Sequence, residues 1–173
     1  MSLKRVVQAA VAMTVAAFAL NAGAQQPNPL DNVPDKMPND FPYGAPISLD
    51  RAEAAINAAV AESRKRGWKL NVAVVDSGGN LVAFQRMDGA QLASIAISEH
   101  KARASATFRR ETKALEAGIQ GGNNYLITLD GVIGSRGGIP LLEGGKLIGA
   151  IGCSGGTGSQ DEVVCKAGAA TVK

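Results

Sequence analysis

Apolar positions in residues 48–67 repeat at the spacing of one helix face. The repeating residues are Leu49, Ala52, Ala55, Ile56, Ala59 and Val60. Ser48 stands before the first of them, and Arg64, Lys65 and Arg66 stand after the last. A serine is favoured at a helix start, and cations are favoured at its C-terminal end. The pattern therefore predicts a helix that Ser48 caps and Gly67 ends.

Two pairs of apolar runs predict β-hairpins. Residues 70–76 and 81–85 flank a Ser-Gly-Gly-Asn turn. The stretch GIPLLEGGKLIGAIGCSG has two further runs around Glu143-Gly144-Gly145. Glycine turns between apolar runs are typical of antiparallel strand pairs. Residues 125–129 and 132–135 are weaker strand candidates.

Two more segments have helical patterns. Residues 92–110 carry apolar side chains on two sides of the predicted helix, so a sheet would cover one side and a second subunit or a ligand the other. The last helix begins near Ser159. Helix, hairpin, helix, further strands and helix is an α+β order in a single domain, not an alternating βαβ order.

The N-terminal residues have the pattern of an export signal. Lys4 and Arg5 precede an uncharged run over residues 6–20, and Ala-Gly-Ala follows at 22–24. We therefore predict a signal peptide at 1–24 and a periplasmic or secreted mature protein. The run is about 15 residues, shorter than the roughly 20 of a membrane-spanning helix. Residues 25–47 hold six of the seven prolines and predict an arm ahead of the domain at 48–173.

Charge and cysteine content narrow the partners. The formal net charge is +3, and removal of Lys4 and Arg5 lowers it to about +1. This excludes a strongly basic surface for nucleic acid. Cys153 and Cys165 would be exported with the chain, where they form either a disulfide or two small buried apolar residues.

The stretch GAIGCSGGTGSQDE places a glycine-rich loop between a strand and a helix. Gly155 and Gly156 permit close backbone approach, and the amides at the helix start favour an anion. Asp161 occupies the third glycine position of a dinucleotide motif, and no Gly-Lys-Ser/Thr follows, so neither nucleotide motif is present. The alternative is a tight turn with Ser159 or Asp161 as the helix cap.

A second glycine pair occurs in the stretch SRGGIP. Gly137 and Gly138 permit close backbone approach, and Arg136 could bind a ligand carboxylate through both arms of its guanidinium. The alternative is a structural bend.

The tail of the first hairpin and the following helix offer further candidates. Arg86 and Asp88 share one side of an extended strand, so we expect them at the rim of a pocket, beside the helix that carries His100 and Lys101. An ion pair at the sheet edge is the alternative. Lys101 has a stripe of small polar neighbours that would leave room for a ligand, namely Ser94, Ser98 and Ser105.

The chain has one histidine, His100, which excludes a multi-histidine metal centre. A neutral imidazole can ligate haem iron, or His100 can be an ordinary surface residue.

Three long motifs occur in a fixed order: NVAVVDSGGNLVAFQRMDGA, then Ser94 with KARASATF, then GGIPLLEGGKLIGAIGCSGGTGSQDE. In this order they resemble the GlcG/HbpS family of haem-binding-related proteins over about residues 47–171. The resemblance implies a profilin-like fold, with a central antiparallel sheet of about five strands flanked by helices, and assembly into homo-oligomers. Exported relatives of this family are similar to extracellular haem-binding proteins.

One departure from the family bears on haem. Some relatives have a histidine after the paired glycines of the first hairpin, where this chain has Asn80. An amide is a poor ligand for haem iron, so iron would use His100, Met87, Tyr125 or no protein ligand. Propionates would pair with cations, for which the candidates are Arg86, Lys101 and Arg136.

Three functions follow from these patterns. The first is a homo-oligomeric protein that binds haem or a related tetrapyrrole without turnover, against the face of the helix at 92–110 that carries Ala93, Ile97, Ala104 and Phe108. The second is an enzyme for a small hydroxy- or keto-acid, with Lys101 as acid or base, Arg86 or Arg136 as clamp, and Asp88 or Asp161 as orienting group. The third is a non-catalytic assembly module with the helix at 92–110 buried between subunits.

Overall fold

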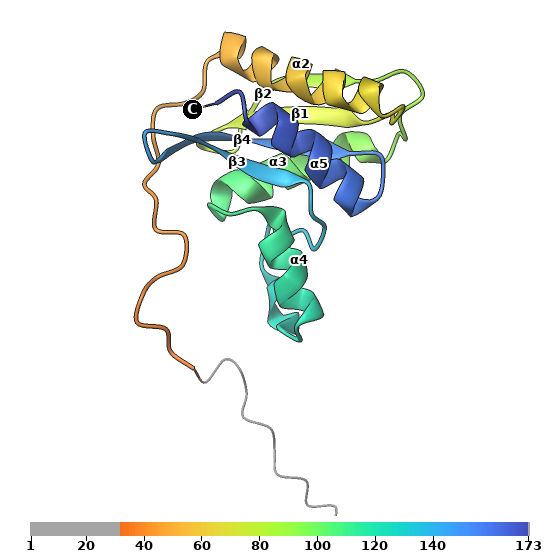
Figure 1. Cartoon of the computed structure of the whole chain (residues 1–173). Helices are drawn as coiled ribbons and strands as arrows, with labels where there is room; N and C mark the ends of the chain where they lie inside the picture. The colour runs from red at the N-terminus through yellow and green to blue at the C-terminus, as the bar shows by residue number, and fades with distance from the viewer. Residues whose placement is uncertain (1–31, 173) are drawn as a thin grey trace, which may run out of the picture. The chain divides into compact units, whose positions relative to one another are not determined.

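Antiparallel strands form a sheet in the order β2-β1-β4-β3 (Figure 1). The structure is a computed structural model that describes residues 32–172, so the predicted signal peptide at 1–24 lies outside the described residues. The strands are β1 (Asn71–Asp76), β2 (Leu81–Arg86), β3 (Gly138–Glu143) and β4 (Lys146–Ser154). Both predicted hairpins are confirmed, and pairing of β1 with β4 joins them into one sheet.

The sheet has four strands within residues 32–172, not the expected five or so. Residues Asn124–Thr128 form a 3-10 helix, η2, and residues 132–135 belong to no strand. Both weaker strand predictions are therefore wrong. The reason is that a short apolar run has no unique period. Leu126 packs against Gly118 of a neighbouring helix instead of pairing with a strand.

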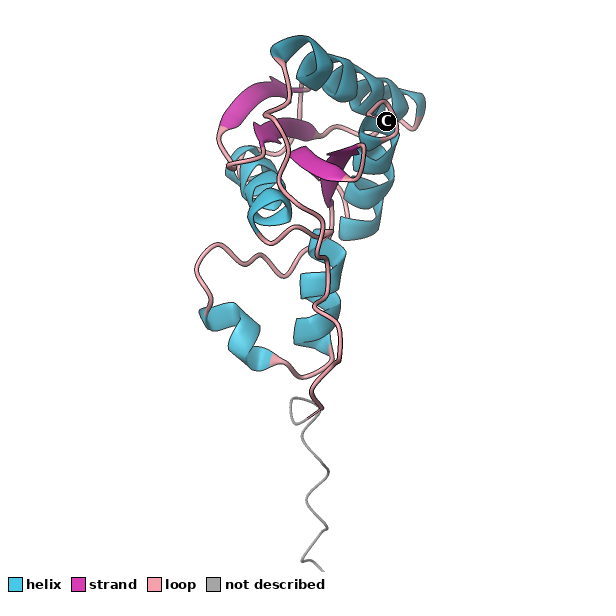
Figure 2. Ribbon diagram, turned by 90° about the vertical axis from the view of Figure 1, so that its left-hand side faces the viewer, coloured by secondary structure: helices cyan, strands magenta, loops and turns pink. Residues whose placement is uncertain are grey.

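Helices cover both faces of the sheet (Figure 2). Helices α2 (Leu49–Lys65) and α5 (Gly158–Ala169) lie on one face, and α3 (Ser94–Thr107) lies on the other. The predicted α+β class and these three helices are confirmed. Ser48 stands at the N-cap position of α2, although its side chain accepts no capping hydrogen bond, and the helix ends just ahead of Gly67.

Strand β1 is buried from both sides because its side chains alternate between two cores. Val72 and Val74 join the larger core beneath α2 and α5. Ala73 and Val75 join the smaller core beneath α3. On the α3 side, this core contains Ala73 and Ala150 of the sheet together with Ala102 and Ala106 of α3, and these small side chains let the helix pack close to the strands.

Glycine permits the closest approach of α3 to the sheet. A Cβ at Gly152 of β4 would overlap the backbone carbonyl of Ser98, and one at Gly138 of β3 would overlap that of Lys101. The backbone of α3 therefore lies directly on β3 and β4. The small residues of α3 fit this contact. The sequence pattern predicted that this helix is covered on two sides, and the sheet covers one of them.

Helix α4 (Thr112–Gln120) was not predicted. It follows α3 along the chain and precedes η2 and β3, and together with η2 it extends away from the sheet (Figure 1). Its first turns are anchored, because Leu115 is buried and the Gly138 N–H donates to Thr112 Oγ1 at 2.9 Å.

The end of the proline-rich arm contacts the sheet. Tyr43 bridges Leu147 in parallel, and the Ile47 N–H donates to the Ile148 carbonyl at 2.8 Å. These contacts use the part of β4 that lies beyond the end of β1. Across residues 32–172, no helix is both long enough and apolar enough to cross a membrane.

Candidate ligand site

A pocket of about 350 Å³ opens between the C-terminal end of α2, the loop that follows it and the tail of β2. Its size is within the range of small-molecule sites. Among the residues that line it are two large side chains of low polarity and four charged ones: Trp68, Met87, Arg64, Lys69, Arg86 and Asp88.

A second pocket of about 340 Å³ shares the loop at 67–69 with the first. Its remaining lining comes from the turn after β2 and from the start of α5, with polar side chains at Gln91 and Gln160. The Lys69 side chain lies over Gly89, where a Cβ would come within 3.1 Å of the ammonium nitrogen. Lys69 therefore borders both pockets.

The loop that bears Trp68 is held by α2. The Trp68 N–H donates to the Ser63 carbonyl, and Ser63 Oγ donates to the Trp68 carbonyl, each at 3.0 Å. Gly67 has φ +68°, a conformation that favours glycine over other residues. The guanidinium of Arg66 lies 5.1 Å from the centre of the Trp68 ring. The indole is therefore fixed in place while part of it faces the first pocket.

The first pocket has an excess of positive charge. Among residues 32–172, no carboxylate lies within the 4.0 Å ion-pair distance of Arg64, Lys69 or Arg86. Asp88 is the one acidic residue in its lining. Three cations beside a partly exposed indole form a surface suited to a flat apolar ligand that carries carboxylates.

Comparison with known proteins assigns the chain to a family. A family model described as "haem degrading protein HbpS-like" matches residues 47–170, which is most of the chain. The chain belongs to the HbpS-like family. The resemblance to the GlcG/HbpS proteins is thereby confirmed.

Two solved structures and one sequence illustrate the relationship. This HbpS-like chain is 40% identical to the protein GlcG of Escherichia coli K12 over 108 residues, 62% of this chain and 81% of that one. A double mutant of HbpS from Streptomyces reticuli superposes with a TM-score of 0.71 at 28% identity, over 82% of this chain and 97% of that chain. A structure named as a PduOC–heme complex superposes with a TM-score of 0.68 at 26% identity, over 75% of this chain and 96% of that chain.

The structure brings Arg86 and Asp88 together in the lining of the first pocket, but this pocket lies beside the end of α2 and not beside the helix that carries His100 and Lys101, where the sequence reasoning expected it. The alternative, an ion pair at the sheet edge, is not formed among the described residues. Their role in ligand binding stays a prediction. The sequence reasoning missed Arg64, Trp68 and Lys69, for which the only signal was the single tryptophan of the chain beside the helix-ending Gly67.

Lys101 lies apart from both pockets. Its side chain is 1% exposed, and its ammonium donates to Asp161 Oδ2 at 2.7 Å. Burial raises the pKa of Asp161, and the charge of Lys101 opposes this effect. The serines beside Lys101 are all buried and leave no room for a ligand: Ser94, Ser98 and Ser105. At Ser98, β4 lies directly on the helix backbone. The expected cavity around Lys101 is therefore filled with packed protein.

The glycine-rich loop before α5 contacts an anion that belongs to the chain itself. The Gly156 N–H donates to Asp161 Oδ1 at 3.0 Å, so one carboxylate holds both this amide and Lys101. The helix cap is neither Ser159 nor Asp161: Thr157 and Gln160 form a reciprocal capping box. Gly155 and Gly156 still line the second pocket.

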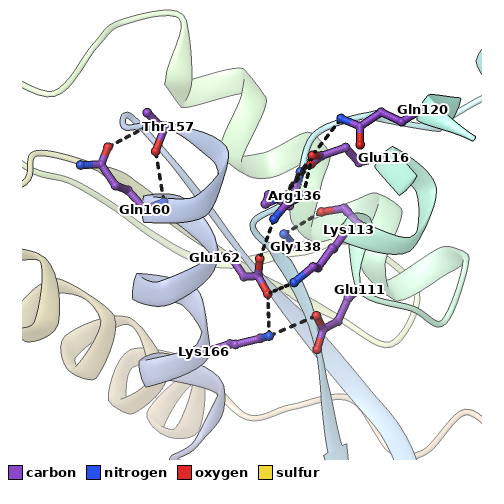
Figure 3. Close-up of polar contacts among 11 residues, drawn as sticks. Glu111, Lys113, Glu116, Gln120, Arg136, Gly138, Thr157, Gln160, Glu162 and Lys166 are labelled. Carbon is purple, nitrogen blue, oxygen red and sulfur yellow. Dashed lines mark hydrogen bonds and ion pairs between the residues drawn. The ribbon is translucent and has the colours of Figure 1, made fainter. Parts of the chain in front are cut away.

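Arg136 also binds a carboxylate of the chain itself. Its Nε and Nη2 donate to both oxygens of Glu116 at 2.9–3.0 Å, and its Nη1 lies 3.5 Å from Glu162 (Figure 3). This hydrogen bonding lowers the pKa of Glu116. The neighbouring Gly137 and Gly138 lie close to Asp161 and to α3. Their packing agrees with the alternative for this stretch, a structural bend.

Glu162 is the centre of an ion-pair network between α4 and α5 (Figure 3). Lys166 lies 2.6 Å and Lys113 3.2 Å from its Oε1, and Lys166 also lies 3.5 Å from Glu111. Burial raises the pKa of Glu162, but the hydrogen bonds and the charges of Lys166 and Lys113 together lower it. Lys166 and Glu162 form a local i,i+4 helix pair, but the pairs with Lys113 and Glu111 join residues about 50 positions apart, which no local sequence pattern could reveal.

His100 and the cysteines lie outside both pockets. The His100 Nε2 atom lies 3.1 Å from the Gly131 carbonyl. Cys153 and Cys165 form a disulfide between β4 and α5. Within residues 32–172, no group of three or more His, Cys, Asp or Glu side chains is arranged to hold a metal ion.

Proposed function

We propose that this HbpS-like chain is an exported protein that binds haem or a related tetrapyrrole in the pocket beside Trp68. The family match and the relative solved with heme support haem-related binding. The observation that carries the choice of pocket is that a half-buried indole lines it together with three cations, Arg64, Lys69 and Arg86, that have no carboxylate partner in the described part of the chain.

The residues of the pocket fit such a ligand chemically. The Trp68 ring and the Val60 side chain supply apolar surface for a porphyrin face. Arg64, Lys69 and Arg86 supply charge-assisted hydrogen bonds for propionates. When bound, haem supplies a redox-active iron. The protein's part is to hold the macrocycle, orient its carboxylates and exclude water from one face.

This position differs from the one that the sequence suggested. The face of the helix at 92–110 that carries Ala93, Ile97, Ala104 and Phe108 was expected to receive the macrocycle, but none of these residues lines either pocket and Ala104 is fully buried. Arg86 is the one propionate partner from the sequence reasoning that lines the first pocket, since Lys101 and Arg136 are paired with carboxylates elsewhere.

Export and homo-oligomer formation belong to the same proposal. The signal-peptide pattern at 1–24 supports export, with cleavage after Ala24 and a periplasmic or secreted mature protein. The resemblance to the family supports assembly. We do not propose the enzyme alternative, because its proposed acid or base, Lys101, is buried in an ion pair with its proposed orienting group, Asp161.

Haemin titration of the mature protein tests the proposal. Trp68 is the only tryptophan of the chain, so its fluorescence reports on the first pocket. We expect a Soret shift and a saturable quenching of Trp68 fluorescence with the same dissociation constant. A titration to tens of micromolar haemin that produces neither signal would overturn the proposal.

A further inference from the structure

Few residue types ligate haem iron in proteins: histidine, methionine, cysteine and tyrosine. The described part of the chain holds the following residues of these types: Met37, Tyr43, Met87, His100, Tyr125, Cys153 and Cys165. Of these, Met87 alone lines either of the two pockets. The fully buried disulfide occupies both cysteine sulfurs.

The remaining side chains are placed elsewhere. The His100 ring is hydrogen-bonded to the Gly131 carbonyl on the side of α3. The Tyr43 hydroxyl donates to the Thr107 carbonyl at 3.0 Å. Tyr125 belongs to η2, in the segment that extends from the sheet with α4 (Figure 1).

The backbone holds Met87 at the wall of the pocket. Its N–H donates to the Leu70 carbonyl at 3.1 Å, and its carbonyl accepts from the Ala90 N–H at 3.0 Å. Gly89, with φ +72°, permits the turn between them. Met87 is half-buried and packs against the larger core. A fixed backbone with a flexible thioether can present sulfur to a metal without rearrangement of the fold.

We propose that Met87 Sδ is the protein ligand of the iron when haem occupies the first pocket. This proposal rests on the proposed function. It assigns the cations of the same pocket to the propionates and the thioether to the metal. A neutral thioether ligand raises the reduction potential of haem iron, so the site would favour the ferrous state relative to a site without this ligand.

The test compares Met87→Leu with wild type and with Met37→Leu. Leucine keeps the apolar volume and removes the sulfur. Met37 is 73% exposed and lies outside the linings of both pockets, so Met37→Leu is the matched control. Each protein is titrated with haemin and with iron-free protoporphyrin IX. We expect Met87→Leu to weaken haemin binding about tenfold or more, to leave protoporphyrin binding unchanged and to lower the reduction potential of the haem-loaded protein.

The remaining outcomes overturn the assignment in separable ways. Equal losses for both porphyrins would show that Met87 only packs against the macrocycle. Unchanged haemin binding and potential in Met87→Leu would show that the iron has no bond to this sulfur. If wild type binds neither porphyrin, the proposed function itself fails. Thermal unfolding of the apo-proteins shows whether the variants are folded as wild type is.

Discussion

Two charged regions of the molecule contrast with each other. Between α4 and α5, every charge of the network has a partner: Arg136 with Glu116, and Glu162 with Lys113 and Lys166. Beside Trp68, Arg64, Lys69 and Arg86 have no carboxylate within ion-pair distance among the described residues.

The contrast shows which cations are free to bind a ligand. Arg86 and Arg136 have similar sequence surroundings, since each lies near a glycine turn at the end of a strand or at its start. Arg136 is already held by a carboxylate of the chain, so a ligand would have to displace Glu116. Arg86 needs no such exchange. The two regions therefore differ more in whether their arginines are paired with carboxylates than in the charges that they carry.

The largest expected effect concerns Lys101. Lys101→Ala should lower the free energy of unfolding by about 3–5 kcal/mol, because it leaves the Asp161 carboxylate buried without its cation. Chemical denaturation of wild type and variant measures the loss. A change within about 0.5 kcal/mol, as for an ordinary surface residue, would contradict a structural role.

A double variant is the control for this loss. Lys101→Met with Asp161→Leu removes both charges and keeps apolar volume, so it should restore much of the stability, since buried ion pairs are often replaceable by apolar residues. If the Lys101–Asp161 pair and the pocket beside Trp68 are independent, the double variant should also bind haemin as wild type does. Weaker haemin binding in a folded double variant would show that this pair and the pocket are coupled.

The next effect concerns Arg86. Arg86→Gln should weaken haemin binding about fivefold, which corresponds to ~1 kcal/mol for an exposed ion pair. Arg51→Gln is the control for net charge, because it removes the same charge outside both pockets, from the first turn of α2, where Arg51 pairs with Glu143. Isothermal titration of the three proteins compares the affinities. Equal losses in both variants would indicate a general charge effect and not a site in this pocket.

The smallest effect is the pH dependence of the network. The pKa of Glu116 is lowered from its ordinary value of 4.5 chiefly by the Arg136 hydrogen bond. A lowered pKa stabilises the fold above the unfolded-state pKa, and this stabilisation is lost as pH falls through the folded-state pKa. The free energy of unfolding of wild type should therefore exceed that of Glu116→Gln by roughly 0.5–1 kcal/mol at neutral pH. This difference should close below about pH 4.5.

Other titratable groups are present in both wild type and Glu116→Gln. Their contributions therefore cancel in the difference between the two free energies of unfolding at each pH. Asp161 has a raised pKa, which contributes in the opposite direction, but it is present in both proteins. Denaturation curves from neutral pH to about pH 3 supply the difference. A difference that stays constant across this range would contradict the role of the Glu116 charge.

Much of the fold was predictable from local pattern. The hairpins follow from glycine turns between apolar runs, and α2 follows from the 3.6-residue spacing of its buried face. Helix α4 was missed because it is only nine residues long and contains Gly118, a poor helix former. Its anchors, buried Leu115 and the hydrogen bond to Thr112, are contacts with residues that are distant in sequence.

The site was predicted in part. The tail of the first hairpin, with Arg86 and Asp88, lines a pocket, although the pocket is beside α2 and not beside the helix of Lys101 as the sequence reasoning expected. Lys101 and Arg136 were grouped with them because they are cations near glycine or serine. Their carboxylate partners, Asp161 and Glu116, lie 60 and 20 positions away along the chain, and no periodicity links such pairs.

The amino-acid sequence by itself determined the family, the α+β order, both hairpins and the helices that cover the sheet, because these features depend on short-range periodicity and turn chemistry. The tertiary structure alone decided which charges are paired and which face a pocket. The physical reason is that an ion pair or a pocket wall depends on distances between side chains brought together by folding, and residue type does not encode those distances.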